Sequence, residues 1–157
     1  MDCSRKPISA NTFRGVAMTI LSPTDERQPA RHSLAGLRMR KHADYQRAYP
    51  ASRKRQSASM SWFLAPQQPA YPGAPLPEAP RVGLTAGKVL GKAHERNRLK
   101  RRMREALRRH TNLLPPGCDL ILHPRRAVLN LDFTKLEAEV VRILQQANSE
   151  AARMTKL

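Results

Sequence analysis

Cysteine is scarce in this chain, with two among 157 residues. Cys3 and Cys118 are too few and too far apart in the sequence for a disulfide framework or a zinc knuckle. Aromatic residues make up only 4% of the chain, so the single core that this length can bury must be mostly aliphatic. We therefore expect one small domain in a reducing, cytoplasmic setting, with no metal site built from cysteines.

Long apolar runs are also missing. The apolar run at residues 15–21 has seven residues, which is much shorter than a membrane span. It continues into Ser22-Pro23-Thr24-Asp25-Glu26 rather than into a small-residue cleavage site. We expect neither a membrane segment nor a signal peptide, and the mixed polar composition of residues 1–33 predicts a disordered N-terminal extension.

Acidic residues are few as well, 12 against 29 lysines and arginines. Those of the second half, such as Asp119, Asp132, Glu137 and Glu139, are scattered. No carboxylate pair, Ser/His/Asp set or His/Cys cluster is visible that would form a protein-based catalytic centre. We therefore expect no catalytic residue and no metal site encoded by the protein.

What the chain has in excess is positive charge, a net +17 with an isoelectric point near 11.3. Residues 31–56 carry eight Lys/Arg against one acid (+7), residues 81–110 carry eleven against two (+9), and the remainder sums to +1. Such a charge favours association with nucleic acid or with an anionic membrane surface. The charge alone does not choose between these two partners.

The segment 95–110 predicts an amphipathic helix. Its apolar positions recur at steps of three and four and share one side of a helix, namely Leu99, Met103, Ala106, Leu107 and His110. The opposite side and its flanks carry Asn97 and eight basic residues: Arg96, Arg98, Lys100, Arg101, Arg102, Arg104, Arg108 and Arg109. A helix built for solubility interleaves opposite charges, because like charges at i and i+4 repel. This concentration of arginine indicates phosphate binding, while a merely solvated basic face is the simpler alternative.

Upstream of this helix, residues 37–49 suit a short helix ended by Pro50. Tyr45 and Tyr49, at i and i+4, share one of its faces among basic residues. Two interpretations are open: the rings stack on unpaired bases, or they are half-buried core residues with their hydroxyl groups at the rim.

The chain next alternates with strand period through Ala58, Met60, Trp62 and Leu64, which predicts one or two strands within 53–66. Residues 66–80 contain six prolines and predict a long, stiff inserted loop. Extended structure resumes at 81–86, and a glycine–lysine connection leads into the basic helix. This connection lacks the spacing of a P-loop, so a nucleotide-binding enzyme is not favoured.

Two further elements follow the basic helix. Residues 118–123 predict a buried strand stopped by Pro124. Thr134 to Glu137 form a possible capping box before an amphipathic packing helix that runs to about Gln146. We assign residues 34–148 to the domain and residues 149–157 to a disordered tail. The predicted order is helix, three strands, helix, strand, helix.

The run Arg96-Asn97-Arg98-Leu99-Lys100-Arg101-Arg102-Met103-Arg104-Glu105 closely resembles the signature of the bacterial ribonuclease P protein component. Segments 43–49, 81–85, 114–121 and 131 onward resemble that family's first helix, third strand, last strand and last helix. The resemblance covers about residues 34–147. It implies an α/β domain, of the α+β two-layer kind, with a four-stranded mixed sheet and a left-handed crossover around the basic helix.

The resemblance also implies the function: an RNA-binding subunit of ribonuclease P that promotes endonucleolytic 5′ maturation of tRNA. Hydrolysis is then carried by the RNA with Mg²⁺, so that no cofactor is bound by the protein. The implied partners are ribonuclease P RNA, bound by a monomeric protein in a 1:1 complex, and precursor tRNA. The residues expected to contact the catalytic RNA are Lys88, Lys92, Arg96, Asn97, Arg98, Lys100, Arg101, Arg104 and Arg108. Those expected to contact the 5′ leader are Tyr45, Tyr49, Trp62 and Phe63.

Some positions depart from the family's pattern. Gly87-Lys88-Val89 stands where the family usually has Ser-Lys-Lys, which leaves Lys88 as the favoured RNA contact. His94-Glu95 replaces an apolar pair. Two rivals from other classes are a ribosomal or RNA-chaperone module, distinguished by the RNA that copurifies, and a DNA-binding helix, which needs a dimer or a groove-length recognition element that we do not find. We expect no DNA partner.

Overall fold

The computed structural model describes residues 33–69 and 71–156. The helices are α1 (His42–Ala51), α2 (Ala93–Arg109) and α3 (Phe133–Thr155), and the strands are β1 (Arg53–Gln56), β2 (Met60–Pro66), β3 (Arg81–Leu84) and β4 (Cys118–Pro124). Three short 3₁₀ turns, Lys88–Leu90, Thr111–Leu113 and Arg126–Asn130, connect them. The predicted order of helices and strands is confirmed. The prediction for residues 1–33 lies outside the described residues except at Ser33.

The four strands form one mixed sheet in the order β1-β2-β4-β3. β1 and β4 each pair antiparallel with β2, and β3 pairs parallel with β4. The connection from β3 through α2 to β4 therefore joins parallel neighbours. The left hand that the family resemblance implies for this connection stays a prediction.

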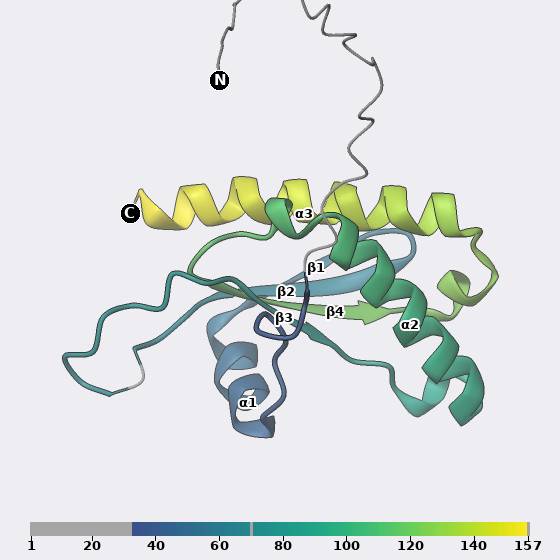
Figure 1. Cartoon of the computed structure of the whole chain (residues 1–157), viewed down its shortest axis with the longest axis horizontal. Coiled ribbons are helices and arrows are strands. Elements are labelled where there is room, and N and C mark those ends of the chain that lie inside the picture. Colours follow the sequence, from purple (N-terminus) through teal and green to yellow (C-terminus); the bar gives the residue numbers. More distant parts are fainter. Residues whose placement is uncertain (1–32, 70, 157) are drawn as a thin grey trace, which may run out of the picture.

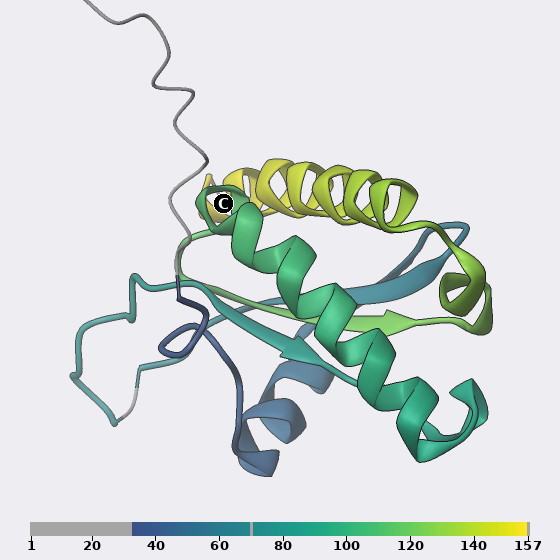
Figure 2. The same ribbon diagram turned by 45° about the vertical axis from the view of Figure 1, so that its right-hand side comes forward.

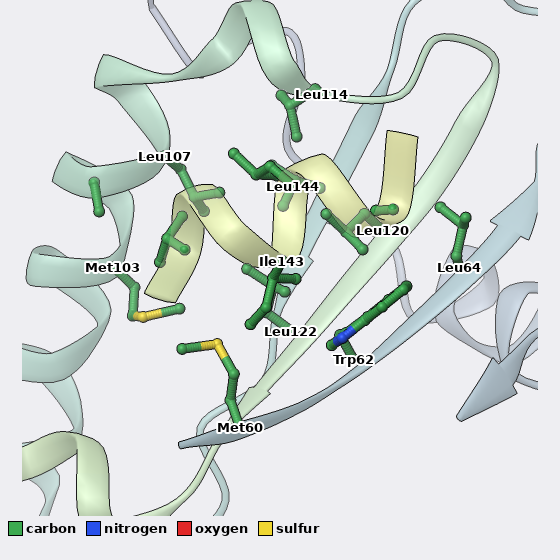
Figure 3. Packing of buried hydrophobic residues seen from close by; sticks show 14 of the residues in the cluster. Met60, Trp62, Leu64, Met103, Leu107, Leu114, Leu120, Leu122, Ile143 and Leu144 are labelled. Carbon is green, nitrogen blue, oxygen red and sulfur yellow. The ribbon is translucent and has the colours of Figure 1, made fainter. Parts of the chain in front are cut away.

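Helices lie on both faces of the sheet. α2 and α3 cover one face and α1 lies against the other, as two views show (Figures 1 and 2). Between the sheet and the helix pair, Met60, Leu122, Met103 and Ile143 are almost fully buried in the main core (Figure 3). A smaller cluster under α1 contains Met39, Ala48, Ala65 and Ile121. Aliphatic residues dominate both clusters, as the low aromatic content predicts.

The first helix begins later than predicted, at His42 rather than near Leu37. The preceding segment is extended because it pairs with β3: the Met39 N–H donates to the Val82 carbonyl at 2.9 Å, and the Val82 N–H donates to the Leu37 carbonyl at 2.7 Å. The helix also continues one residue past Pro50. Pro50 has no N–H to donate within the helix. Ser52 closes the end by donating its N–H and its hydroxyl to the Tyr49 carbonyl.

The last helix differs from the prediction at both ends. It begins at Phe133, so Thr134 lies inside the first turn and does not cap it; Glu137 instead contacts His110 and Arg109. The helix also extends to Thr155, so the predicted disordered tail is helical over residues 149–155. Ala147 and Ala151 are buried and continue the apolar stripe at a spacing of four. This packing against the core explains the additional turns.

The proline-rich segment is a loop, as predicted: the described residues 67–69 and 71–80 contain no helix or strand. Its base is fixed to the start of β4. The Gln67 amide donates to the carbonyls of Ala79 (2.8 Å) and Cys118 (3.0 Å), and the Gly117 N–H donates to the Glu78 carbonyl (2.9 Å). The insertion therefore leaves and re-enters the sheet at one place without disturbing the strand order.

Candidate nucleic-acid interface

The arginine-rich helix α2 has the predicted buried stripe except at His110, which lies just past its end, is partly exposed and contacts Glu137. Leu99, Met103, Ala106 and Leu107 are at most 1% exposed. At its start, Gly91 has a φ of 121°, which favours glycine, and the Glu95 carboxylate accepts the Lys92 N–H at 2.7 Å. These contacts fix the rotation of the helix, and with it the direction in which its basic side chains point.

Three of the arginines on α2 already form hydrogen bonds or ion pairs within the protein. Arg102 donates to the carbonyls of Leu129 and Leu131. Arg108 donates to Glu105 at 2.7 Å, and Arg109 contacts Glu105 and Glu137 while its guanidinium lies 4.9 Å from the centre of the Phe133 ring. Arg108, a predicted RNA contact, therefore already has a carboxylate partner. This pairing also holds the pKa of Glu105 below its usual range.

Four other basic side chains form what we call the open basic face of α2: Arg98, Lys100, Arg101 and Arg104. Within the described part of the chain, none of them has a salt bridge or a side-chain hydrogen bond. The predicted contact Asn97 is exposed beside them, and the buried Nε of Arg96 has no partner among described residues. Because none of the four side chains is ion-paired with a described residue, this face is available to an external polyanion.

Two arginines from outside the helix join this face. Arg38 and Arg40 line a hollow of about 330 Å³ together with Arg101, Arg104 and the ion-paired Arg108 and Glu105. The β-bridge between Arg38 and Val82 holds the segment in place. The pKa of Arg104 is lowered mainly by partial burial, and repulsion from Arg38 and Arg101 lowers it further. Sequence reasoning missed Arg38 and Arg40 as site residues, because it placed them in a helix.

The two predicted lysine contacts precede α2. Lys88 opens the 3₁₀ turn Lys88–Leu90, and Lys92 is the residue just before the helix. Both are exposed, and neither forms a salt bridge with a described residue. They extend the positive charge past the start of α2. Val89, where the family usually has a lysine, is 87% exposed.

An aromatic cluster occupies the other face of the sheet, next to α1. The rings of Tyr49 and Phe63 meet edge to face with centroids 5.2 Å apart, and the Tyr49 hydroxyl lies 2.8 Å from Nε2 of His123. Tyr45, half-buried, donates its hydroxyl to the Met39 carbonyl at 3.4 Å, and burial raises its pKa. Burial and the nearby Lys54 lower the pKa of His123. His123 and Lys54 were not among the predicted site residues.

The tyrosines also face toward α2. Tyr45 and Tyr49 line a hollow of about 370 Å³ together with His42, Leu84 and Lys100. An extended strand lying here would contact aromatic rings on one side and the open basic face of α2 on the other. Such a combination of stacking surfaces and cations is typical of single-stranded nucleic-acid binding.

Trp62 does not belong to this aromatic cluster. It is 2% exposed and lies in the main core on the opposite face of the sheet, beneath α3 (Figure 3). Successive side chains of a strand point to opposite faces, so Trp62 and Phe63 cannot serve one surface. The prediction of Trp62 as a leader contact is therefore wrong, while Phe63 lies beside Tyr49.

The described residues hold no group of three His, Cys, Asp or Glu side chains arranged to bind a metal ion. No described helix has the length and apolarity to cross a lipid bilayer.

Comparison with known proteins identifies the family. The sequence model of the family Ribonuclease P matches residues 35–148. A ribonuclease P protein component of Thermobifida fusca is 34% identical over 105 residues, covering 66% of this chain and 70% of that protein. The corresponding protein of Chloroflexus aggregans is 34% identical over 111 residues, covering 70% and 76%.

The solved structures agree in fold. The RNase P protein of Thermotoga maritima superimposes with a TM-score of 0.59 at 24% identity, covering 69% of this chain and 96% of that one. A mutant RNase P protein of Staphylococcus aureus gives 0.60 at 23% identity, covering 73% and 90%. Because the family model matches residues 35–148, the chain belongs to the ribonuclease P protein component family and has its role in ribonuclease P and tRNA processing.

Proposed function

We propose that this protein binds the catalytic RNA of ribonuclease P through the open basic face of α2, and that it guides the 5′ leader of precursor tRNA along the hollow beside Tyr45 and Tyr49. The observation that carries the proposal is the unpaired state of Arg98, Lys100 and Arg101 among the described residues. Cations held close together in a folded domain repel one another, and binding of an external anion relieves this repulsion.

Arginine suits this task because its planar guanidinium binds phosphate oxygens in pairs. Arg38 and Arg40 add two more such groups from the segment before α1. Lys88, Lys92, Arg96 and Asn97 extend the surface toward the start of α2. Arg108 contributes to the same hollow while it is bound to Glu105.

We assign the leader to the hollow that Lys100 shares with Tyr45 and Tyr49. Aromatic rings stack on any base, so Tyr45, Tyr49 and Phe63 provide affinity without requiring a leader sequence. Mature tRNA lacks the leader and therefore gains nothing from this surface. The protein would thus distinguish substrate from product.

The chemical step belongs to the RNA in this proposal. The protein supplies positioning, while Mg²⁺ held by the RNA assists phosphodiester hydrolysis. A monomeric protein in a 1:1 cytoplasmic complex with the RNA suffices, and neither DNA nor a membrane is a partner.

The experiment compares Arg101→Gln with Lys135→Gln. Both side chains are exposed, both changes remove one positive charge, and Lys135 lies on α3 outside the basic face. We expect Arg101→Gln to weaken catalytic-RNA binding and to make the log–log salt slope shallower by about 0.7, using the single-strand coefficient. Lys135→Gln is expected to leave both unchanged. Equal behaviour of the two variants would overturn the proposal, as would a complex that does not improve precursor cleavage.

A further inference from the structure

A second hollow lies away from the aromatic cluster and the open basic face of α2. It has a volume of about 570 Å³ and lies between the β1 edge of the sheet and the C-terminal half of α3. Its walls include Arg55 on one side and Arg142, Gln145, Gln146 and Arg153 on the other. We call it the α3 groove. Nothing in the proposed function uses it.

The pairing of β1 with β2 explains why Arg55 points into this groove. Arg55 lies directly opposite Trp62, whose ring is buried under α3. Residues paired across a sheet share a face, so Arg55 points toward α3, while the next residue, Lys54, pairs with Phe63 on the other face. The basic strand β1 therefore divides its charges between the two faces.

The groove carries more positive charge than it neutralises. Arg55 is paired with Glu150, at 2.9 Å between Nη2 and Oε1. Arg142 has 61% of its side chain exposed, and its contact with Glu139 is long, at 3.6 Å. Arg153 is exposed and forms no salt bridge with a described residue. Two cations are thus available to a ligand.

Uncharged hydrogen-bonding groups lie between these cations. The side-chain amides of Gln145 and Gln146 are exposed and make no hydrogen bond to described residues. Amides that donate and accept beside arginines match the sugar and phosphate oxygens of a nucleic-acid backbone. The chemistry of the groove is therefore suited to a polynucleotide strand.

The position of the groove selects between the two RNAs of the complex. The groove is lined by α3, which covers the same face of the sheet as α2 (Figures 1 and 2). The tyrosines and Phe63 pack against the cluster under α1, on the opposite face. The groove therefore shares a face of the sheet with α2 and not with the surface proposed for the leader.

We infer that the α3 groove is a second binding site for the backbone of the catalytic RNA, on the far side of α3 from α2, with Arg142 and Arg153 as its phosphate contacts. The site is partly built by turns beyond the family match, which ends at residue 148, because Glu150 and Arg153 belong to the continuation of α3. This inference rests on the proposed function, since it assigns a further surface to the same RNA.

The test uses the full chain and the catalytic RNA over a series of salt concentrations, with Arg142→Gln, Arg153→Gln and the control Lys135→Gln. One phosphate contact contributes a factor of salt concentration to the power of about −0.7, so each groove variant should bind about fourfold more weakly at roughly 0.15 M salt. The salt slope should also become shallower by about 0.7 in each. All three side chains are exposed, so we expect unchanged melting temperatures.

Each result decides a separate point. If Arg142→Gln and Arg153→Gln behave like Lys135→Gln while Arg101→Gln still weakens binding, the groove does not contact the catalytic RNA. If the groove variants weaken only the binding of precursor tRNA to the assembled enzyme, the assignment to the catalytic RNA is wrong. Failure of the proposed function shows differently, as unchanged affinity in Arg101→Gln.

Discussion

The ring of Tyr45 lies directly on the backbone of Gly83: a Cβ placed on Gly83 would be 2.7 Å from Cε1 of the ring and 2.9 Å from its hydroxyl oxygen. This contact fixes α1 against β3. It supports the packing interpretation of this tyrosine, because the residue is half-buried and its hydroxyl donates to the Met39 carbonyl. The remaining exposed edge lines the hollow next to Lys100, so stacking on bases stays a proposal.

Gly83→Ala should therefore disturb the attachment of α1. The added methyl group forces the Tyr45 ring to move, and we expect a loss of about 1–3 kcal/mol in the free energy of unfolding, as for other overpacked sites. Urea unfolding can be followed through Trp62, which is the only tryptophan and is buried.

Gly36→Ala is the matched control for this change. A Cβ on Gly36 meets nothing within 4 Å, so we expect no comparable loss of stability. If both variants unfold at the same urea concentration, Tyr45 does not pack on Gly83 as described.

Arg102→Ala should act on stability rather than on RNA binding. Its guanidinium donates to the carbonyls of Leu129 and Leu131 and so connects α2 to the turn before α3. Loss of hydrogen bonds from a charged donor costs about 1–3 kcal/mol. Arg98→Ala, which removes an exposed arginine without such contacts, should leave the unfolding curve unchanged and weaken binding of the catalytic RNA.

Thermal unfolding and filter binding of these two variants separate the roles. A stable Arg102→Ala with weakened RNA binding would show that this arginine faces the RNA. Arg98 and Arg102 look equivalent in the sequence, yet we expect Arg98 to affect RNA binding and Arg102 to affect stability.

The sequence predicts those parts of the structure that follow from the periodic spacing of apolar residues along one helix or strand. The stripe of Leu99, Met103 and Leu107 has the helical period, and so the buried side of α2 was predicted correctly. The alternation through Met60 and Trp62 likewise predicted a strand. That period does not say which face of the sheet a helix will cover, and for this reason Trp62 was assigned to the wrong surface.

Non-local pairing accounts for most of the remaining errors. The extended segment before α1 follows from backbone hydrogen bonds to Val82, which is more than forty residues away in the sequence. The hydrogen bonds of Arg102 are made to carbonyls near the start of α3. The convergence of Arg38 with Arg104 depends on the same β-bridge to Val82. No window of local sequence contains these contacts.

Tyr45→Ala should distinguish leader binding from general RNA affinity. We expect the reconstituted enzyme to lose affinity for precursor tRNA, by about 1–3 kcal/mol for a stacked base, and to keep its affinity for mature tRNA, which has no leader. Binding of the catalytic RNA should barely change, because Tyr45 is not on the open basic face of α2.

Tyr45→Phe and the melting temperature of Tyr45→Ala control for packing. The phenylalanine keeps the ring against Gly83 and loses only the hydroxyl group that donates to the Met39 carbonyl. We expect it to retain precursor binding. An alanine variant that melts much earlier and loses both tRNAs equally would assign Tyr45 to packing alone.

His123 should make the stability of the protein depend on pH near neutrality. Partial burial among Tyr49 and Phe63, together with the charge of Lys54, holds the pKa of His123 below its ordinary value of 6.5. The unfolded chain then binds a proton at a pH where the native protein does not. The contribution is present above about pH 6.5 and is lost as the pH falls toward the lowered native pKa. Urea unfolding between about pH 7 and pH 5 should therefore show a slope that His123→Gln reduces, because glutamine does not titrate. Parallel curves for the two proteins would mean that His123 is protonated in the folded protein as readily as in the unfolded chain, and that its neutral ring is not required beside Tyr49.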